Sequence, residues 1–489
     1  MKNHALVLLF LLSGLSWLAS AQGPGVLTSI PSNGNHNMVR FDAVTGGFIA
    51  ASSHSGGVIH FIKTDLLNYS EVIIEVNATI MDFEIIDRFI FFCGEKFPYG
   101  GFLGCISIDS LFTLGVGAHM DMDLYSTVGL TSLRKIEVFK DGSVYHIAGF
   151  GRDVSLDPVA FEAVGHPYTG MKYRTLLLEY DNYKNEILDM AVTENYVVYL
   201  RHHVGRLWDC APYYNWGITL IPFKKFNMFD PSLLPAYFFQ TSVNSTYGSD
   251  VYVENIEPAG YLSKIVQVDG DNVAVCAHRR ENDFLNCYPA NDFCDCERNY
   301  VKTYLTLRHY NLTPLAANSP IVMTSACAAV FNNGETTSIP GFKYDKSNKN
   351  YLVLHRHETS LGVQDYCVTA FDFSGGVPAF ASSEYQTIHS TTSEWEPYNL
   401  CLDNSSHYLV GGADRLSLSH YYFWLNNVVG STVSACNNII DNPVVDVPLV
   451  NEKSLINMNT PTTWYLLSLN AYRTQVIASA GCEQICPQY

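Results

Sequence analysis

Residues 133–149 read LRKIEVFKDGSVYHIAG, and this stretch decides the fold class. Apolar residues alternate with polar ones along its first half, Asp141 and Gly142 follow, and its second half is more continuously apolar. Two apolar runs joined by an Asp-Gly turn are typical of a β-hairpin. The stretch therefore predicts a hairpin whose second strand is the more deeply buried.

The same pattern of alternating run, polar turn and apolar run occurs six more times along the chain. These copies lie at residues 38–53, 81–94, 187–201, 264–278, 342–356 and 398–412. Their spacing of roughly 40 to 80 residues fits one four-stranded antiparallel sheet per copy. We expect a third strand after each hairpin, at residues 58–62, 102–108, 175–180, 216–222, 302–308, 366–373 and 416–425, and a fourth strand clearly only in places, as at 71–76.

Repeated small sheets without sustained helical periodicity predict an all-β chain. Such sheets pack best around a central axis, where each buries both faces against its neighbours. We therefore predict a seven-bladed β-propeller over residues 22–436, with eight blades or tandem β-sandwiches as alternatives. Residues 437–489 change pattern and would complete the last blade, seal the ring with an N-terminal strand at 26–30, or form a small β appendage.

Over residues 38–425 the chain resembles β-propellers in general. No particular propeller family is indicated, because the repeated Trp-Asp dipeptide is missing and Trp208-Asp209 occurs alone. The resemblance therefore implies a fold and no activity.

Composition limits the classes of function. The chain has 489 residues, of which 47% are hydrophobic and 16% charged, with a formal net charge of −18. It can bury a core, but it is too long for a single core. Nucleic acid is not expected as a partner, because binding a phosphate backbone requires a basic surface.

The N-terminus predicts export. Lys2, an apolar run at residues 5–12 and the small residues Ala19, Ser20 and Ala21 form a signal peptide over residues 1–21. An N-terminal membrane anchor is the alternative. No later stretch is long and apolar enough for a transmembrane segment. We expect a secreted, extracellular or cell-surface protein, or a periplasmic one in a bacterial host.

All 13 cysteines follow the predicted signal peptide, and an oxidising compartment favours disulfides. Cys93 with Cys105, which flank a Gly- and Pro-containing loop, is the best predicted pair, followed by Cys482 with Cys486. Cys287, Cys294, Cys296 and His278 have the ligand types of a zinc site, but the C-x2-C spacing is absent. We predict no metal and no cofactor.

No catalytic motif is found. The chain lacks a zinc-binding H-E-x-x-H, a G-x-S-x-G nucleophile elbow and a phosphate-binding Gly-rich loop. The motif search therefore favours a binding protein over an enzyme.

Basic residues gather where the second strand of several predicted hairpins ends. In a propeller these ends open on one face, so we expect a basic mouth for an anionic glycan or peptide. Its residues are Arg201, His202, His203, Arg206, Trp208, His278, Arg279, Arg280, His355, Arg356, His357 and Arg415. The alternative is that these side chains pair with acids such as Glu281, Asp283 and Glu358.

Three functions follow as hypotheses. The first is a secreted or surface-exposed binding module that uses the basic mouth. The second is a glycan- or peptide-hydrolysing enzyme with carboxylates or histidines at the same mouth. The third is a structural or adhesive component of a surface assembly. Oligomeric state is not indicated by the sequence.

Overall fold

The fold was analysed in a computed structural model of the chain. The residues that it describes are 26–31, 35–54, 57–65, 68–96, 98, 100–109, 119–127, 129–180, 185–206, 214–229, 238–242, 252–253, 263–285, 297–312, 322–331, 334–359, 364–373, 379–385, 395–404, 407–414, 420–427, 450–452, 456–458, 465–466, 468–481 and 483–485. Regular structure in these residues is almost entirely β, which confirms the predicted all-β class.

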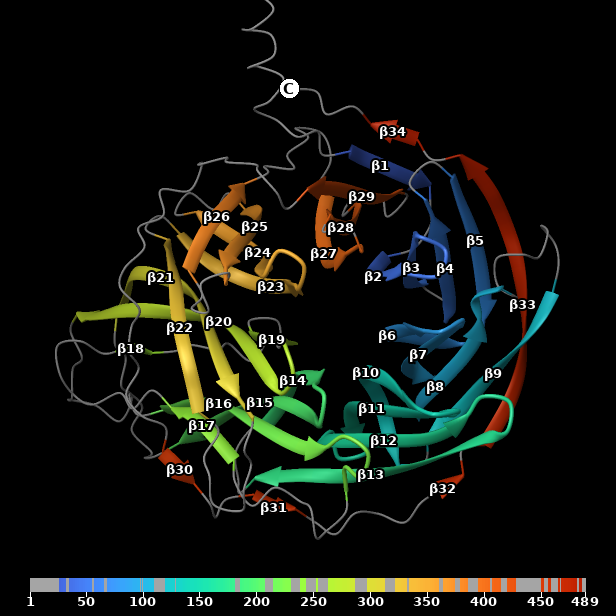
Figure 1. The fold of residues 1–489 in the computed structure, drawn as a ribbon, viewed down its shortest axis with the longest axis horizontal. Coiled ribbons are helices and arrows are strands. Elements are labelled where there is room, and N and C mark those ends of the chain that lie inside the picture. The colour runs from blue at the N-terminus through green and yellow to red at the C-terminus, as the bar shows by residue number, and fades with distance from the viewer. Residues whose placement is uncertain are drawn as a thin grey trace, which may run out of the picture.

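The strands form small antiparallel sheets that follow one another around a ring (Figure 1). The first has the order β2-β3-β4-β5-β33-β9-β8-β7-β6, with β2 (Asn35–Asp42), β3 (Gly47–His54), β4 (Val58–Thr64), β5 (Asn68–Glu75), β6 (Ala78–Ile86), β7 (Phe89–Lys96), β8 (Gly100–Ser107), β9 (His119–Thr127) and β33 (Ser468–Gly481).

The next two sheets have the orders β10-β11-β12-β13-β31, with β32 also beside β13, and β14-β15-β16-β17-β30. Their strands are β10 (Leu130–Asp141), β11 (Val144–Asp153), β12 (Pro158–His166), β13 (Gly170–Tyr180), β14 (Asn185–Val192), β15 (Tyr196–Arg206), β16 (Tyr214–Lys224), β17 (Phe238–Ser242), β30 (Val450–Glu452), β31 (Ile456–Met458) and β32 (Tyr465–Leu466).

The other sheets have the orders β18-β20-β21-β22, with β19 beside β20, β23-β24-β25-β26, and β27-β28-β29-β1-β34. Their strands are β18 (Tyr252–Val253), β19 (Ser263–Gln267), β20 (Asn272–Leu285), β21 (Glu297–Asn311), β22 (Val322–Phe331), β23 (Gly334–Asp345), β24 (Asn350–Thr359), β25 (Gln364–Asp372), β26 (Ala379–Tyr385), β27 (Trp395–Leu402), β28 (His407–Asp414), β29 (His420–Asn427), β1 (Val26–Pro31) and β34 (Glu483–Ile485).

Every predicted hairpin is an antiparallel strand pair in the structure. The pairs are β2-β3, β6-β7, β10-β11, β14-β15, β19-β20, β23-β24 and β27-β28, whose members we name first strands and second strands. One predicted third strand was wrong, because residues 175–180 lie in the fourth strand β13, while β12 is the third.

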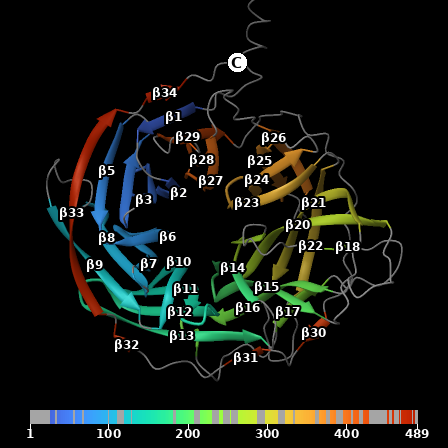
Figure 2. The ribbon, with the colours of Figure 1, turned by 180° about the vertical axis from the view of Figure 1, so that it is seen from behind.

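The first strands lie nearest the centre of the ring (Figures 1 and 2). Each packs against the first strand of the next hairpin along the chain, and β27 packs against β2. Contacts between hairpin turns join neighbouring sheets, with Lys140 Nζ 2.7 Å from Asp87 and Lys346 Nζ 2.9 Å from Asp269. Neighbouring first strands meet both at their middles and at the hairpin turns that follow them, so they run in the same direction. The second strands run back from the turns and therefore end on the face of the ring opposite to the turns.

Apolar cores lie between neighbouring sheets, including the first and last along the chain. Ile90 and Phe92 of β7 pack toward β2-β5, while Phe91 and Cys93 of the same strand pack toward β10-β13. A strand that is buried on both faces needs apolar residues at consecutive positions. This burial explains the continuously apolar second half of each repeat.

The first strands bulge where they pass the far end of the second strands. Register shifts occur between Ile80 and Asp82 in β6, and between Leu130 and Ser132 and between Leu133 and Lys135 in β10. The bulge carries the backbone over a glycine, and a Cβ atom on Gly151 would lie 2.0 Å from the carbonyl oxygen of Ser132. Glycine is required here because the two backbones approach each other so closely.

The C-terminal strands add to the outer strands of several sheets, and β33 joins β5 to β9 within the nine-stranded sheet. β30 pairs with β17, β31 and β32 pair with β13, β33 pairs with both β9 and β5, and β34 pairs with β1. The long strand β33 is seen on the outside of the ring in both views (Figures 1 and 2). The N-terminal strand β1, close to the predicted 26–30, lies between β29 and β34.

The predicted disulfide between Cys93 and Cys105 is not formed; both residues are buried thiols. Cys93 lies opposite Leu103, and Cys105 lies opposite Phe91, so the two cysteines are diagonal neighbours on adjacent strands. Diagonal Cα atoms are about 7 to 8 Å apart, beyond the usual span of a disulfide. Cys482 and Cys486 lie outside the described residues.

Among the residues that the structure describes, no helix has the length and apolar character needed to cross a membrane.

Candidate functional site

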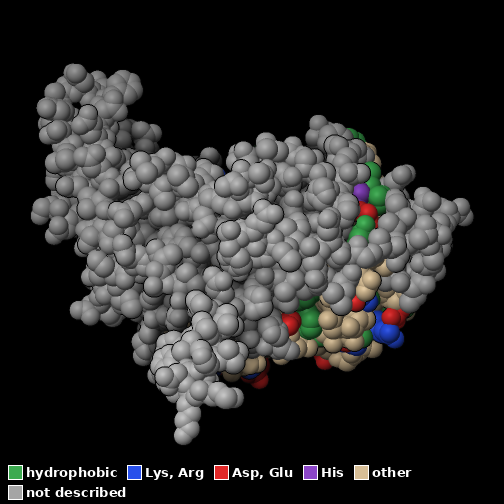
Figure 3. Space-filling model, turned by 90° about the horizontal axis from the view of Figure 1, so that it is seen from above, with side chains coloured by type: hydrophobic (Ala, Val, Ile, Leu, Met, Phe, Trp, Pro, Cys, Tyr) green, Lys and Arg blue, Asp and Glu red, His purple; other side chains and the backbone are tan. Residues whose placement is uncertain are grey.

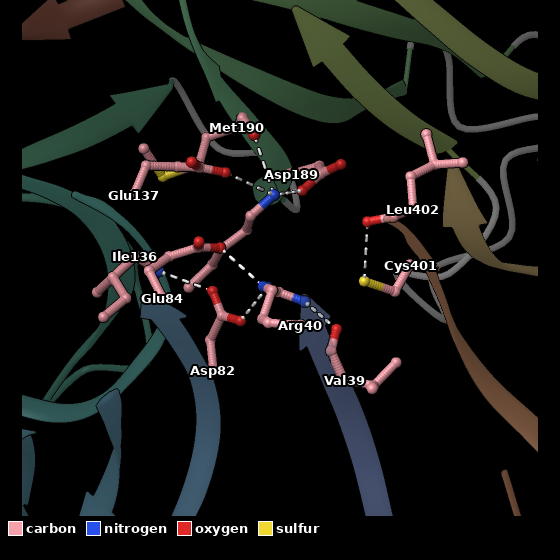
Figure 4. A network of polar contacts seen from close by, with 11 residues as sticks. Val39, Arg40, Asp82, Glu84, Ile136, Glu137, Asp189, Met190, Cys401 and Leu402 are labelled. Atoms are coloured by element: carbon pink, nitrogen blue, oxygen red, sulfur yellow. Dashed lines mark hydrogen bonds and ion pairs between the residues drawn. The ribbon is translucent and has the colours of Figure 1, made fainter. Parts of the chain in front are cut away.

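Charged side chains line the first strands at the centre of the ring. We name this group the axial cluster; it consists of Arg40, Asp82, Glu84, Lys135, Glu137, Asp189, Lys264 and Lys343. Four of these residues are basic and four acidic. Figure 4 shows those from β2, β6, β10 and β14 directed toward one another. Their placement on adjacent strands makes a mixed-charge surface around the axis.

Arg40 joins β2 to β6. Its Nη2 donates to Asp82 at 2.8 Å and its Nε donates to Glu84 at 3.0 Å (Figure 4). Burial opposes the charge of Arg40, but the two carboxylates outweigh burial and raise its pKa above the usual value. A guanidinium held by two carboxylates is a fixed charge with a defined orientation.

Carboxylates of the axial cluster also accept backbone hydrogen bonds from the next sheet. Asp82 Oδ2 accepts from the N–H of Ile136 on β10, and Asp189 Oδ2 accepts from the N–H of Ile265 on β19, each at 3.0 Å. In both cases a lysine precedes the donor, Lys135 and Lys264 respectively. The same contact is therefore made at equivalent places in two neighbouring pairs of sheets.

Lys135 joins β10 to β14. Its Nζ donates to Asp189 Oδ1 at 2.5 Å and to the carbonyl oxygen of Met190 at 3.0 Å. Burial opposes its charge, but Asp189 and Glu137 outweigh burial and raise its pKa. Burial likewise acts against the charge of Asp189, yet Lys135 and Lys264 hold the pKa of this carboxyl below its usual range.

Two other acids of the axial cluster have raised pKa values, in contrast to Asp189. Burial raises the pKa of Asp82, although Arg40 favours its charged form. Burial, together with the nearby carboxylate of Glu84, raises the pKa of Glu137 to about 7. The side chain of Glu137 is 30% exposed, so this carboxyl can exchange protons near neutral pH.

Basic residues also occur on the face where the second strands end. Arg134 Nη1 and Arg152 Nη2 both donate to Glu186 Oε1, at 3.0 and 2.9 Å. Two guanidinium groups that share one carboxylate leave an excess of positive charge. All three side chains are partly exposed, so this triad can meet a ligand on that face.

Two of the predicted mouth residues are buried inside the sheets. Arg201 is 2% exposed, and His355 is fully buried with its Nε2 2.8 Å from Thr369 Oγ1. Arg356, next along β24, is partly exposed. Arg201 and His355 belong to the packed interior because strands buried on both faces enclose even polar side chains.

For the other predicted mouth residues, the structure describes only the position of the backbone, or does not describe the residue. His202, His203 and Arg206 follow Arg201 on β15, His278, Arg279 and Arg280 lie on β20, and His357 lies on β24. His278 lies at the middle of its strand, and the others lie on the half of the strand farther from the hairpin turn. Trp208 and Arg415 fall outside the described residues.

The axial cluster was not among the sites predicted from the sequence, which concerned the ends of the second strands. A signal was present, because Arg40, Asp82, Lys135, Asp189, Lys264 and Lys343 recur at similar places in successive repeats. Polar residues at equivalent positions of successive repeats are expected to lie together at the axis when the repeats form a ring.

The described residues contain no group of three or more His, Cys, Asp or Glu side chains suited to hold a metal ion. Seen from above, the described part of the visible surface carries both acidic and basic side chains (Figure 3).

Comparison of the chain with protein-family models and with curated proteins finds no match.

Proposed function

We propose that this chain is a seven-bladed β-propeller that acts as a binding module for an anionic glycan or peptide. Seven first strands in succession, from β2 to β27, each begin a unit of small antiparallel strands and support this blade count. The contact of β27 with β2 supports closure of the ring, with β1 as the outer strand of the last blade.

One observation carries the ligand class. The first strands share one direction, so basic residues near the ends of different second strands belong to one face. The triad of Arg134, Arg152 and Glu186 lies there, and the backbones of Arg206 and Arg280 lie in the halves of β15 and β20 that are farther from the hairpin turns. On a chain with a net charge of −18, a local basic region attracts anionic groups and holds them by charge-assisted hydrogen bonds.

We further propose that the mature protein begins near residue 22 and acts outside the cell or at its surface. The charged start, apolar run and small-residue cleavage site at residues 1–21 support this location. Detection of a mature N-terminus near Gln22 in culture medium or periplasm would support it. Recovery of the intact N-terminus in the cytoplasm would contradict it.

Screening of the mature chain on an array of acidic and neutral glycans, and with acidic peptides, tests the binding proposal. We expect binding to anionic probes that weakens with rising salt. The variant Arg152→Ala/Arg279→Ala/Arg280→Ala should weaken it by about tenfold or more. Arg88→Ala is the matched control, because Arg88 is 63% exposed on a hairpin turn at the opposite face. Equal binding by both variants would reject the proposed face.

A further inference from the structure

Lys264 and Lys343 differ from the other basic residues of the axial cluster. They lie on β19 and β23, which pack against each other at the centre of the ring. Arg40 and Lys135 are held by ion pairs within 3.0 Å. In the part of the chain that the structure describes, neither Lys264 nor Lys343 forms an ion pair or a side-chain hydrogen bond.

The carboxylates near these two lysines are already engaged. Asp189 holds Lys135 Nζ and the N–H of Ile265, while Asp82 holds Arg40 and the N–H of Ile136. Glu84 is bound to the same guanidinium. Glu137, the remaining acid of the axial cluster, acts on Lys343 and lies 3.6 Å from Lys135 Nζ. The ion pairs of the axial cluster therefore run from β2 to β14, and β19 and β23 contribute only the basic residues Lys264 and Lys343 to it.

The pKa shifts of Lys264 and Lys343 also differ in direction from those of Arg40 and Lys135. Burial lowers the pKa of Lys264. Lys135 and Lys343 also oppose its charged form, whereas Asp189 and Asp82 favour it. Burial and the neighbouring Arg40 lower the pKa of Lys343. Lys135 also opposes its charged form, whereas Cys401 and Glu84 favour it. A desolvated ammonium group without a hydrogen-bonded counter-charge is costly, so a negatively charged group beside these lysines would be stabilised.

We propose that Lys264 and Lys343 form a binding site at the ring axis for a small oxyanion, either a phosphate or a carboxylate group. Two ammonium groups on adjacent strands can each donate to different oxygens of one such group. The site uses different residues from those of the proposed basic face and does not depend on it. Lys135 and Arg40 are fixed by their own partners and serve as its boundary.

Calorimetric titration of the full mature chain tests this site, with inorganic phosphate and succinate as separate probes at matched ionic strength. We expect saturable binding of at least one probe, and the stronger of the two identifies the source of the anionic oxygens. The variant Lys264→Met/Lys343→Met should lose at least about tenfold in affinity. Lys346→Met is the control, since Lys346 lies just after β23 with a 76% exposed side chain.

A second measurement separates a binding site from a structural charge. In buffer without either probe, the double variant should unfold at the same or a higher temperature than the wild type, because two desolvated charges are removed. Retained affinity in the double variant, absence of saturable binding in the wild type, or a lower unfolding temperature of the double variant would each overturn the proposal.

Discussion

Lys135 and Asp189 join two neighbouring sheets across a separation of 54 residues, with Nζ donating to the carboxylate at 2.5 Å. Asp189 is 5% exposed at its side chain and accepts a second hydrogen bond from Ile265 on the following sheet. One carboxylate thus connects β10, β14 and β19 at the axis. The pair therefore adds a polar link between sheets that are also joined by apolar cores.

Loss of this carboxylate charge should destabilise the fold. We expect Asp189→Asn to lower the free energy of unfolding by about 3 kcal/mol, because Lys135 keeps a buried charge without its partner. The double variant Lys135→Met/Asp189→Asn should recover most of that loss, since the amide oxygen can still accept from Ile265. Urea denaturation measures both, and equal stability of the two variants would show that the pair contributes nothing specific.

Glu137 should make stability depend on pH. Its pKa in the folded protein is raised to about 7, so the folded state holds a proton that the unfolded state has released. Stability is therefore full at low pH and falls as pH rises from about 4.5 to about 7. Glu137→Gln should remove this decline and gain up to about 3 kcal/mol above pH 7 relative to the wild type.

Thermal or urea unfolding between pH 4 and pH 8 tests this difference. Glu194→Gln, at an exposed turn, serves as the control and should follow the wild-type profile. A constant difference between Glu137→Gln and the wild type across this range would contradict the raised pKa.

The strand β33 should protect the two strands that it joins within the nine-stranded sheet. It pairs with β5 through Val476 and with β9 through Tyr472. A chain ending at residue 467 exposes both edges to water, so amide exchange in β5 and β9 should accelerate by about tenfold or more. A chain ending at residue 481 keeps β33 and is the control. Similar exchange in both truncated chains would mean that β33 adds no protection.

The close approach at Gly151 should make a single methyl group costly. Its Cβ would meet the carbonyl oxygen of Ser132 at 2.0 Å. We expect Gly151→Ala to destabilise by about 2 to 3 kcal/mol, because the backbone of the bulge must move. Gly100→Ala has no atom within 4 Å of its Cβ and should change stability by less than about 0.5 kcal/mol. Chemical denaturation compares the two.

Cys93 and Cys105 should react as thiols once the protein unfolds. Alkylation in denaturant without a reductant, followed by peptide mass analysis, should label both residues. The intact fold should protect them, because both are buried. A peptide pair joined through these residues would contradict the structure.

The hairpins could be predicted from sequence because the two strands and the turn of each hairpin lie in one continuous stretch of the chain. Asp141 and Gly142 fix the turn, and the apolar residues of β11 record burial on both faces. The predicted third strand at 175–180 was placed one strand too far along the chain, since spacing alone does not count the strands between two turns. The diagonal placement of Cys93 and Cys105 depends on strand register, which their separation in sequence does not specify.

The sequence by itself determined the all-β class and the repeated hairpins, because turn residues and apolar periodicity act over a few neighbouring positions. The tertiary structure alone decided that Arg40 meets Glu84, that Lys135 meets Asp189, and that Arg201 and His355 lie inside the sheets. These outcomes require residues from separate repeats to come together, and electrostatic attraction and burial depend on distance in space, which a linear pattern does not contain.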